Sequence, residues 1–109
     1  MGRGSRTPDE ASLTRWLVLT EKAEVDLLET RDWYDARRFG LGNEFIFAVD
    51  ACFANIEAMP DAFVIVHGEI RRALLKKFPY AVLFRVADEE ILIVGCLHTS
   101  RDRSSWEER

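Results

Sequence analysis

Apolar and polar positions follow two different rhythms along this chain. Between about residues 20 and 58, apolar residues recur every three or four positions, which is the period of an α-helix with one buried face. From residue 63 onward they come in short, dense runs rich in valine, isoleucine and phenylalanine, which is typical of β-strands. A short apolar run at 16–19 precedes the helical part. The pattern predicts an α+β protein in the order strand, two helices, then several strands.

The first helix has a recognisable start and end. Thr20 is a suitable N-cap, and Glu21 places negative charge near the positive end of the helix dipole. Arg37 and Arg38 suit the opposite end of that dipole, and Gly40 can take a left-handed cap beyond it. Between these ends one stripe is predicted to face the core: Ala23, Leu27, Thr30 and Tyr34.

The second helix repeats this arrangement after a turn at 40–42. Its predicted buried stripe consists of Phe45, Val49, Cys52 and Ile56, widened by Ile46, Ala48 and Phe53. Met59 and Pro60 end the helix, because proline cannot continue it. The two helices predict an antiparallel helical hairpin whose aromatic residues belong to the core.

Two long apolar runs near the C-terminus predict an antiparallel β-hairpin with an acidic turn at 88–90. Alternation places one set of the first strand on a common face: Phe78, Tyr80, Val82, Phe84 and Val86. In the second strand, alternation places two sets of residues on opposite faces: Ile91, Ile93, Gly95 and Leu97 on one, and Leu92, Val94, Cys96 and His98 on the other. Such apolar strands are predicted to be covered on both sides, by the helical hairpin and by either a C-terminal segment with Trp106 or a second molecule.

Length and composition set the frame for these elements. The chain has 109 residues, which suits one domain, and 48% of them are hydrophobic. Residues 1–15 are rich in glycine, arginine and serine, so we expect a disordered or loosely attached tail before a domain at 16–109. No apolar run reaches the ~20 residues of a membrane span, and the N-terminus lacks the apolar core of a secretory leader. We therefore expect a cytoplasmic protein.

Cysteines and histidines that could bind a metal are few. Cys52 lies in a helical pattern and Cys96 in a strand pattern, where cysteines are usually buried small apolar residues. The two histidines, His67 and His98, do not complete a cluster of ligands. We therefore assign no metal and no cofactor.

The most specific stretch of the sequence runs from residue 70 to residue 101. The pair Arg71-Arg72 is followed by Lys76-Lys77-Phe78-Pro79-Tyr80, then by the two long strands, and finally by His98-Thr99-Ser100-Arg101. This succession resembles the RelE/ParE superfamily of bacterial type II toxins. The resemblance implies a β-α-α-β-β-β fold with a helical hairpin packed on a small antiparallel sheet. It also favours a strand at 70–75 with its apolar residues facing the helices, whereas propensity alone leaves this segment open between strand and helix.

The activity that the resemblance implies depends on the branch of the superfamily. RelE-like members cleave messenger RNA in the ribosome with arginines and lysines, often with a histidine or glutamate as base and a tyrosine near the C-terminus. The catalytic candidates here are Arg71, Arg85, His98 and Arg101. The match is poor, because an arginine of several ribonucleases falls on Ala81 and the histidine-tyrosine pair falls near Thr99-Ser100. We interpret His98 as a structural residue that orients the C-terminal segment, with a role as base as the alternative.

Charge favours the other branch. The formal net charge is −4, whereas binding in the ribosome benefits from a positive field. We therefore favour a ParE-like toxin of plasmid-stabilisation type, which inhibits DNA gyrase without a hydrolytic site and is neutralised by a cognate antitoxin in a hetero-oligomer. The alternatives are a RelE-like ribosome-dependent mRNA endonuclease and a non-toxic member that acts only as a binding partner. The residues expected to meet the antitoxin or the target are Arg71, Arg72, Lys76, Lys77, Arg85 and Arg101.

Overall fold

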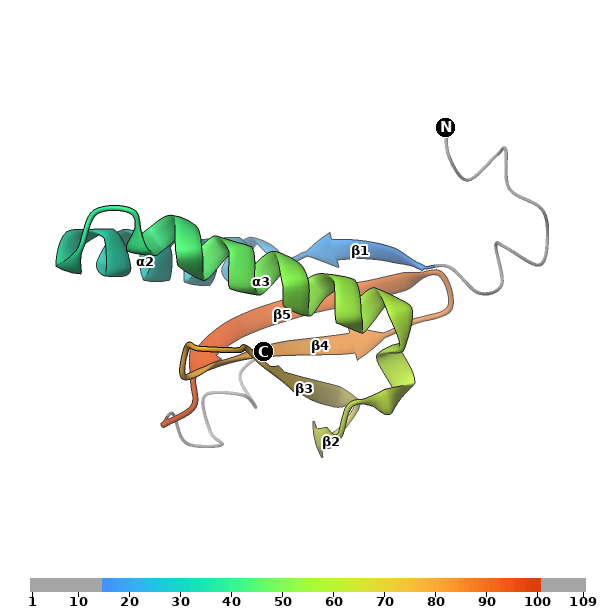
Figure 1. Cartoon of the computed structure of the whole chain (residues 1–109). Helices are drawn as coiled ribbons and strands as arrows, with labels where there is room; N and C mark the ends of the chain where they lie inside the picture. The colour runs from blue at the N-terminus through green and yellow to red at the C-terminus, as the bar shows by residue number, and fades with distance from the viewer. Residues whose placement is uncertain (1–14, 101–109) are drawn as a thin grey trace.

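Two helices lie on one face of a five-stranded sheet in this protein (Figure 1). The structure is a computed structural model that describes residues 15–100. The elements follow in the order β1 (Trp16–Leu19), α2 (Glu21–Arg37), α3 (Leu41–Ala58), the 3₁₀ turn η2 (Pro60–Ala62), β2 (Ile65–His67), β3 (Ile70–Leu74), β4 (Tyr80–Val86) and β5 (Glu90–His98). The predicted α+β class and the strand–helix–helix–strands order are confirmed. None of the helices described is long and apolar enough to cross a membrane.

The sheet has the strand order β1-β5-β4-β3-β2. β2, β3, β4 and β5 pair antiparallel in sequence, as consecutive hairpins do. β1 pairs parallel with β5, with Trp16 opposite Glu90 and Leu19 opposite Ile93. The expectation of a purely antiparallel sheet is therefore corrected to a mixed sheet. The reason is that β1 and β5 are joined through the whole domain, so no tight turn fixes their relative direction.

Helix α2 begins and ends where its sequence predicts. The Thr20 hydroxyl accepts a hydrogen bond of 3.1 Å from the Ala23 amide, so Thr20 is the N-cap. The helix ends at Arg37, and the amide of the C-cap residue Arg38 donates to the Tyr34 carbonyl. Ala23, Leu27 and Thr30 are buried, as the stripe predicted.

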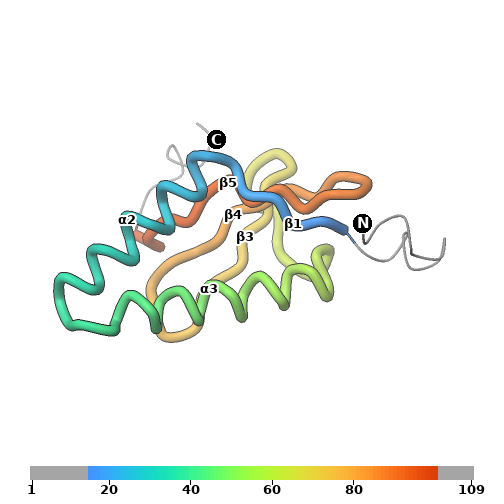
Figure 2. Tube along the Cα trace, turned by 90° about the horizontal axis from the view of Figure 1, so that it is seen from above, coloured from blue at the N-terminus to red at the C-terminus, as the bar shows by residue number. Residues whose placement is uncertain are grey.

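The turn between α2 and α3 is held by one carboxylate. Asp35 Oδ1 accepts a hydrogen bond of 2.7 Å from the Gly42 amide in the first turn of α3. Gly40 lies in the left-handed region with φ of 90°, which favours glycine. A Cβ at Gly42 would lie 2.6 Å from the Arg31 carbonyl oxygen, so the two helices approach here as only glycine permits. Viewed from above, they meet at this turn and diverge away from it (Figure 2).

The main core lies between the helices and the sheet. It contains the predicted stripes of both helices together with strand residues: Ala23, Leu27, Phe45, Val49, Cys52, Ile56, Ala73, Leu75, Val82, Phe84, Ile91, Ile93 and Cys96. A smaller cluster occupies the opposite face of the sheet and consists of Ile70, Leu83, Val94 and Leu97. The apolar residues of both long strands are thus divided between two sides of the sheet, as predicted.

Two details of that division differ from the alternation expected. The register between β4 and β5 shifts where Leu83 pairs with Gly95 and Phe84 with Ile93, so Val94 is an extra residue in β5. Cys96 therefore joins Ile91 and Ile93 in the main core, and Leu97 turns to the opposite face. Ile70 was expected to face the helices, but it belongs to the cluster on the opposite face.

Candidate functional site

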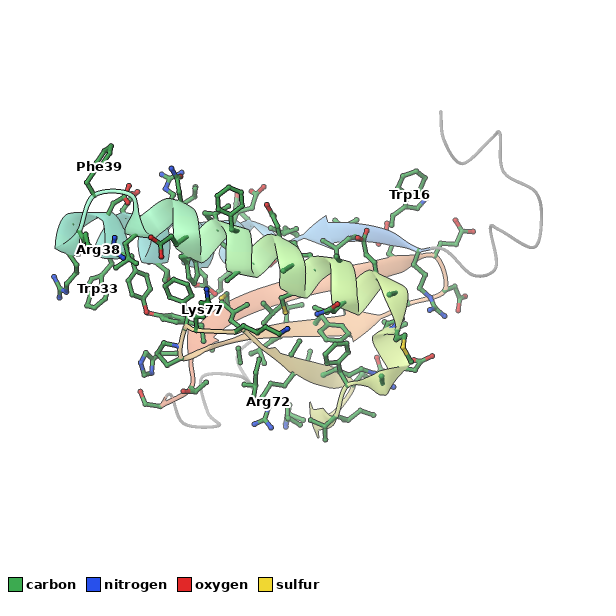
Figure 3. All side chains as sticks on the ribbon, viewed as in Figure 1. Trp16, Trp33, Arg38, Phe39, Arg72 and Lys77 are labelled. Carbon is green, nitrogen blue, oxygen red and sulfur yellow. The ribbon has the colours of Figure 1, made fainter. Side chains whose placement is uncertain are left out.

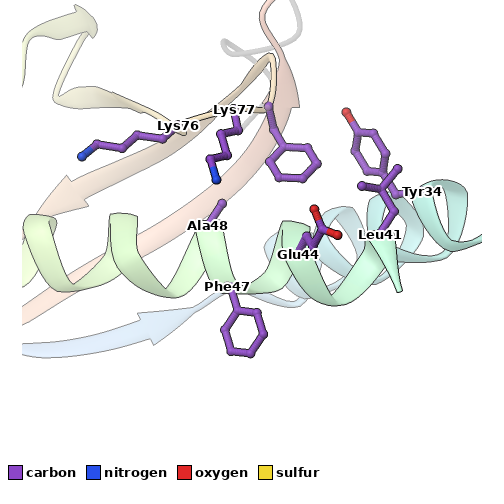
Figure 4. Close-up of a pocket in the computed structure, with 8 residues that line it drawn as sticks. Tyr34, Leu41, Glu44, Phe47, Ala48, Lys76 and Lys77 are labelled. Carbon is purple, nitrogen blue, oxygen red and sulfur yellow. The ribbon is translucent and has the colours of Figure 1, made fainter. Parts of the chain in front are cut away.

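A groove of about 700 Å³ opens between α3 and the loop that joins β3 to β4 (Figure 4). Its lining comes from three places in the sequence: Tyr34 of α2, then Leu41, Glu44, Phe47 and Ala48 of α3, then Lys76, Lys77 and Phe78 of the loop. The α3 positions follow helical spacing but lie beside the buried stripe rather than on it. One side of α3 therefore fills the core while the adjacent side forms a wall of the groove.

A network of aromatic rings lies behind the groove. The Tyr34 ring lies 5.0 Å from that of Phe78 and 5.7 Å from that of Phe45. Phe45 contacts Phe78 at 5.5 Å, edge to face. Tyr80 extends the network from Phe45 at 5.6 Å to His98 at 5.2 Å. Such edge-to-face contacts fix ring positions, so the groove has a firm apolar base.

Tyr34 contributes a titratable phenol to this base. Burial raises the pKa of the Tyr34 phenol above its usual value, and the neighbouring Tyr80 and Cys96 add to that shift. The phenol therefore stays protonated at neutral pH. It can donate a hydrogen bond but does not supply a base.

The loop carries its two lysines in an uncommon conformation. Lys77 has φ of 71°, in the left-handed region that side chains other than glycine rarely adopt. Backbone hydrogen bonds close the loop on both sides: the Leu75 amide donates to the Tyr80 carbonyl at 3.0 Å, and the Tyr80 amide donates to the Phe78 carbonyl at 2.8 Å. The Lys77 side chain reaches toward Ala48 (Figure 4). Both lysines are exposed, and both line the groove.

Among the predicted arginines, Arg71, Arg72 and Arg85 do not line the groove with the lysines. Arg71 Nη1 donates to the Phe63 carbonyl at 2.7 Å and Nη2 lies 3.6 Å from an Asp61 carboxylate oxygen, so Arg71 holds the segment before β2. Arg72 pairs with Leu83 and lies on the face of the sheet opposite the helices. Arg85 is exposed on that same face. Arg101 and Trp106 lie outside the described residues.

His98 is the last residue of β5, where hydrogen bonds hold the end of the strand. Its Nδ1 accepts a hydrogen bond of 3.0 Å from the Ser100 amide. The Thr99 amide donates to the Pro79 carbonyl at 2.8 Å and ties the end of β5 to the β3–β4 loop. These bonds support the interpretation that His98 orients the chain after β5.

The three catalytic candidates that the structure describes are not brought together. Arg71 lies opposite Phe84 and His98 lies opposite Tyr80 on the same strand, four residues away. At the usual rise per residue this separates them by about 13 Å along the strand. Arg85 is on the other face of the sheet. Within residues 15–100, no group of three or more histidines, cysteines or carboxylates is placed to hold a metal ion.

Sequence reasoning missed most of the groove. Phe47 was assigned to the core with the other aromatics of its helix, but it is 72% exposed. A signal was available, because Glu44, Phe47 and Ala48 share a face that adjoins the stripe of Phe45 and Val49. The contribution of Tyr34 depends on how the helices diverge, which a helical period does not specify.

Comparison with known proteins places this arrangement in a family. Residues 17–103 match the family described as the ParE toxin of the type II toxin-antitoxin system, parDE. The chain is 32% identical over 87 residues to a protein named Toxin ParE2 from two strains of Mycobacterium tuberculosis, CDC 1551 / Oshkosh and H37Rv. The match covers 79% of this chain and 83% of that protein. Its fold is similar to a chain of the chromosomal ParDE TA system from P. aeruginosa, with a TM-score of 0.71, 20% identity, and coverage of 80% and 98% of the two chains.

Proposed function

Because the chain belongs to the ParE toxin family of type II toxin-antitoxin systems, we propose that it inhibits DNA gyrase and is neutralised by a cognate antitoxin. We favour gyrase over messenger RNA as the target because the described catalytic candidates Arg71, Arg85 and His98 lie apart from one another. General acid–base cleavage needs a base and cationic groups within hydrogen-bond reach of one phosphate. Arg71 is engaged with Phe63 and Asp61, and the His98 Nδ1 atom is engaged with Ser100. Action by binding fits this arrangement better than hydrolysis.

The net charge of −4 supports the same choice. A protein that acts on ribosomal RNA gains affinity by neutralising phosphates. A chain with a net negative charge gains less affinity in this way. Gyrase is a cytoplasmic enzyme, so the proposal places this protein in the cytoplasm.

The antitoxin is expected on the face of the sheet opposite the helices. Leu74 is 58% exposed there, next to the half-buried Arg72 on the same strand. Arg85 lies on β4 diagonally across from Arg72, since Arg72 pairs with Leu83. An antitoxin segment with alternating acidic and apolar side chains complements this surface in charge and in hydrophobicity.

Induction of the chain without antitoxin tests the proposal. Gyrase inhibition predicts filamentous cells and DNA-damage signalling while bulk messenger RNA stays intact. Codon-positioned cleavage of translated messages within minutes would instead establish the ribonuclease alternative. Normal growth would establish the non-toxic alternative.

A further inference from the structure

Three exposed aromatic side chains of the described residues come from the two helices and the turn between them. Phe39 in the α2–α3 turn is 95% exposed, and Phe47 in the second turn of α3 is 72% exposed. Trp33, near the end of α2, is about half exposed. Figure 3 shows Phe39 and Trp33 projecting from the hairpin end of the molecule. Rings of this size in water are typical of a surface that binds another molecule.

Cationic side chains lie over Trp33 and along the groove. The Arg37 guanidinium lies 3.8 Å over the Trp33 ring, as a cation–π pair. Lys76 and Lys77 line the groove from the β3–β4 loop, and the Phe47 ring projects from the other side of α3 (Figure 4). Glu44, the one carboxylate in that lining, lies 3.4 Å from Arg38. We call the set Trp33, Arg37, Phe39, Phe47, Lys76 and Lys77 the tip face.

We propose that the tip face docks an acidic segment of the toxin's protein target, with one apolar side chain of that segment in the groove against Phe78 and Tyr34. Carboxylates of the segment then meet Lys76 and Lys77. The inference rests on the proposed function, because it names the surface by which this toxin holds its target. It also separates that surface from the sheet face proposed for the antitoxin.

The composition of the tip face favours a protein over a nucleic acid. Aromatic side chains and arginine are the residues most enriched at the centres of protein interfaces. The tip face contributes three cationic groups, and Glu44 is the one carboxylate of the groove lining, although the whole chain has a net charge of −4. A short acidic segment interacts mainly with the charges of the tip face, because salt screens more distant charges. An extended polyanion is also repelled by the negative charges on the rest of the chain.

The conformation of Lys77 offers a sharp test of a binding role. A lysine at φ of 71° is less stable than glycine would be at the same place. Replacing it by glycine removes both the ammonium group and the backbone strain. A merely structural residue would show no loss of function from such a change.

The experiment compares the full-length wild type with Lys77→Gly, Phe47→Ala and the control Lys22→Ala, an exposed lysine in the first turn of α2. Inhibition of purified gyrase, growth arrest on induction and thermal melting are measured for each. We expect Lys77→Gly and Phe47→Ala to need at least about tenfold more protein for gyrase inhibition, and to arrest growth weakly. Their melting temperatures should be equal to or above that of the wild type, and Lys22→Ala should match the wild type throughout.

Full inhibition and full growth arrest by both groove variants would overturn the proposal. A loss confined to binding of bare duplex DNA would make the tip face a nucleic-acid surface and would also overturn it. If the wild type arrests growth without inhibiting gyrase, the gyrase assignment fails, and the tip face stands or falls on whether the two variants lose that arrest. A wild type that does not arrest growth overturns both proposals.

Discussion

The carboxylate of Asp26 on α2 accepts a hydrogen bond of 3.0 Å from the backbone amide of Cys96 on β5. β1 pairs with β5 only as far as Ile93, and the Thr20 amide donates to the Ile93 carbonyl where α2 begins. Asp26 thus provides an acceptor on the part of the β5 edge that β1 does not reach. A helix covers this edge, which would otherwise offer a template for another strand.

Removing the Asp26 carboxylate should destabilise the fold. Asp26→Ala takes away an acceptor from a buried amide, and we expect the free energy of unfolding to fall by about 1–3 kcal/mol in urea denaturation. Asp26→Asn keeps an acceptor oxygen at the same place, so it should cost less. Equal stability of the alanine variant and the wild type would show that this hydrogen bond is unimportant.

The helical hairpin should be sensitive to a single methyl group at Gly42. The Cβ of Gly42→Ala would meet the Arg31 carbonyl oxygen at 2.6 Å and Asp35 Oδ1 at 2.7 Å, so the helices must separate. We expect a loss of about 2–3 kcal/mol in unfolding free energy. Gly68→Ala is the control, because it has φ of 54° but open space, and should cost about 1 kcal/mol. A smaller effect at Gly42 than at Gly68 would contradict the close approach.

The Cys52 thiol should make the stability of the fold decrease at alkaline pH. Burial raises the pKa of its thiol from 9.0 to about 11, so the folded chain holds this proton over a range in which the unfolded chain releases it. The stabilisation is complete below about pH 9 and is lost as the pH rises toward 11, by about 2–3 kcal/mol at most. Melting of the wild type and Cys52→Ala across this range should show a steeper decline for the wild type. Parallel curves would rule out this contribution.

Arg71 and Arg85 should respond differently to alanine substitution. Arg71→Ala leaves the Phe63 carbonyl without its 2.7 Å donor, and we expect a loss of about 1–3 kcal/mol in unfolding free energy. Arg85 is exposed, so Arg85→Ala should change stability by less than about 0.5 kcal/mol and weaken antitoxin binding instead. A stable Arg71→Ala that has lost toxicity would favour a catalytic role for Arg71.

The local features of the fold could be predicted because they depend on short spacings. The Thr20 cap and the stripes of Leu27 and Phe45 follow from a helical period and a hydroxyl at the right position. The parallel pairing of β1 with β5 could not, since it joins segments from opposite ends of the domain.

The extra residue at Val94 was also beyond prediction. Every position from Ile91 to Val94 is apolar, so a strand can shift its register there and still bury apolar side chains on both faces. Periodicity alone therefore placed Cys96 and Leu97 on the wrong faces.

The candidate site was predicted in part. Lys76 and Lys77 were identified from the sequence, and they do line the groove. The hydrogen bonds of Arg71 and the exposure of Phe47 depend on the path of η2 and on how α2 and α3 diverge, which no local pattern determines. Charge and hydrophobicity identify residues that can bind, but tertiary packing decides which of them are free to do so.

The most direct measurement of the proposed function is supercoiling by purified gyrase in the presence of the purified chain. We expect the chain to stop supercoiling in a concentration-dependent manner, and the protein encoded by the neighbouring antitoxin gene to restore it. Unchanged supercoiling at saturating concentrations of the chain, together with cleavage of translated messenger RNA, would contradict the assignment of this toxin to gyrase.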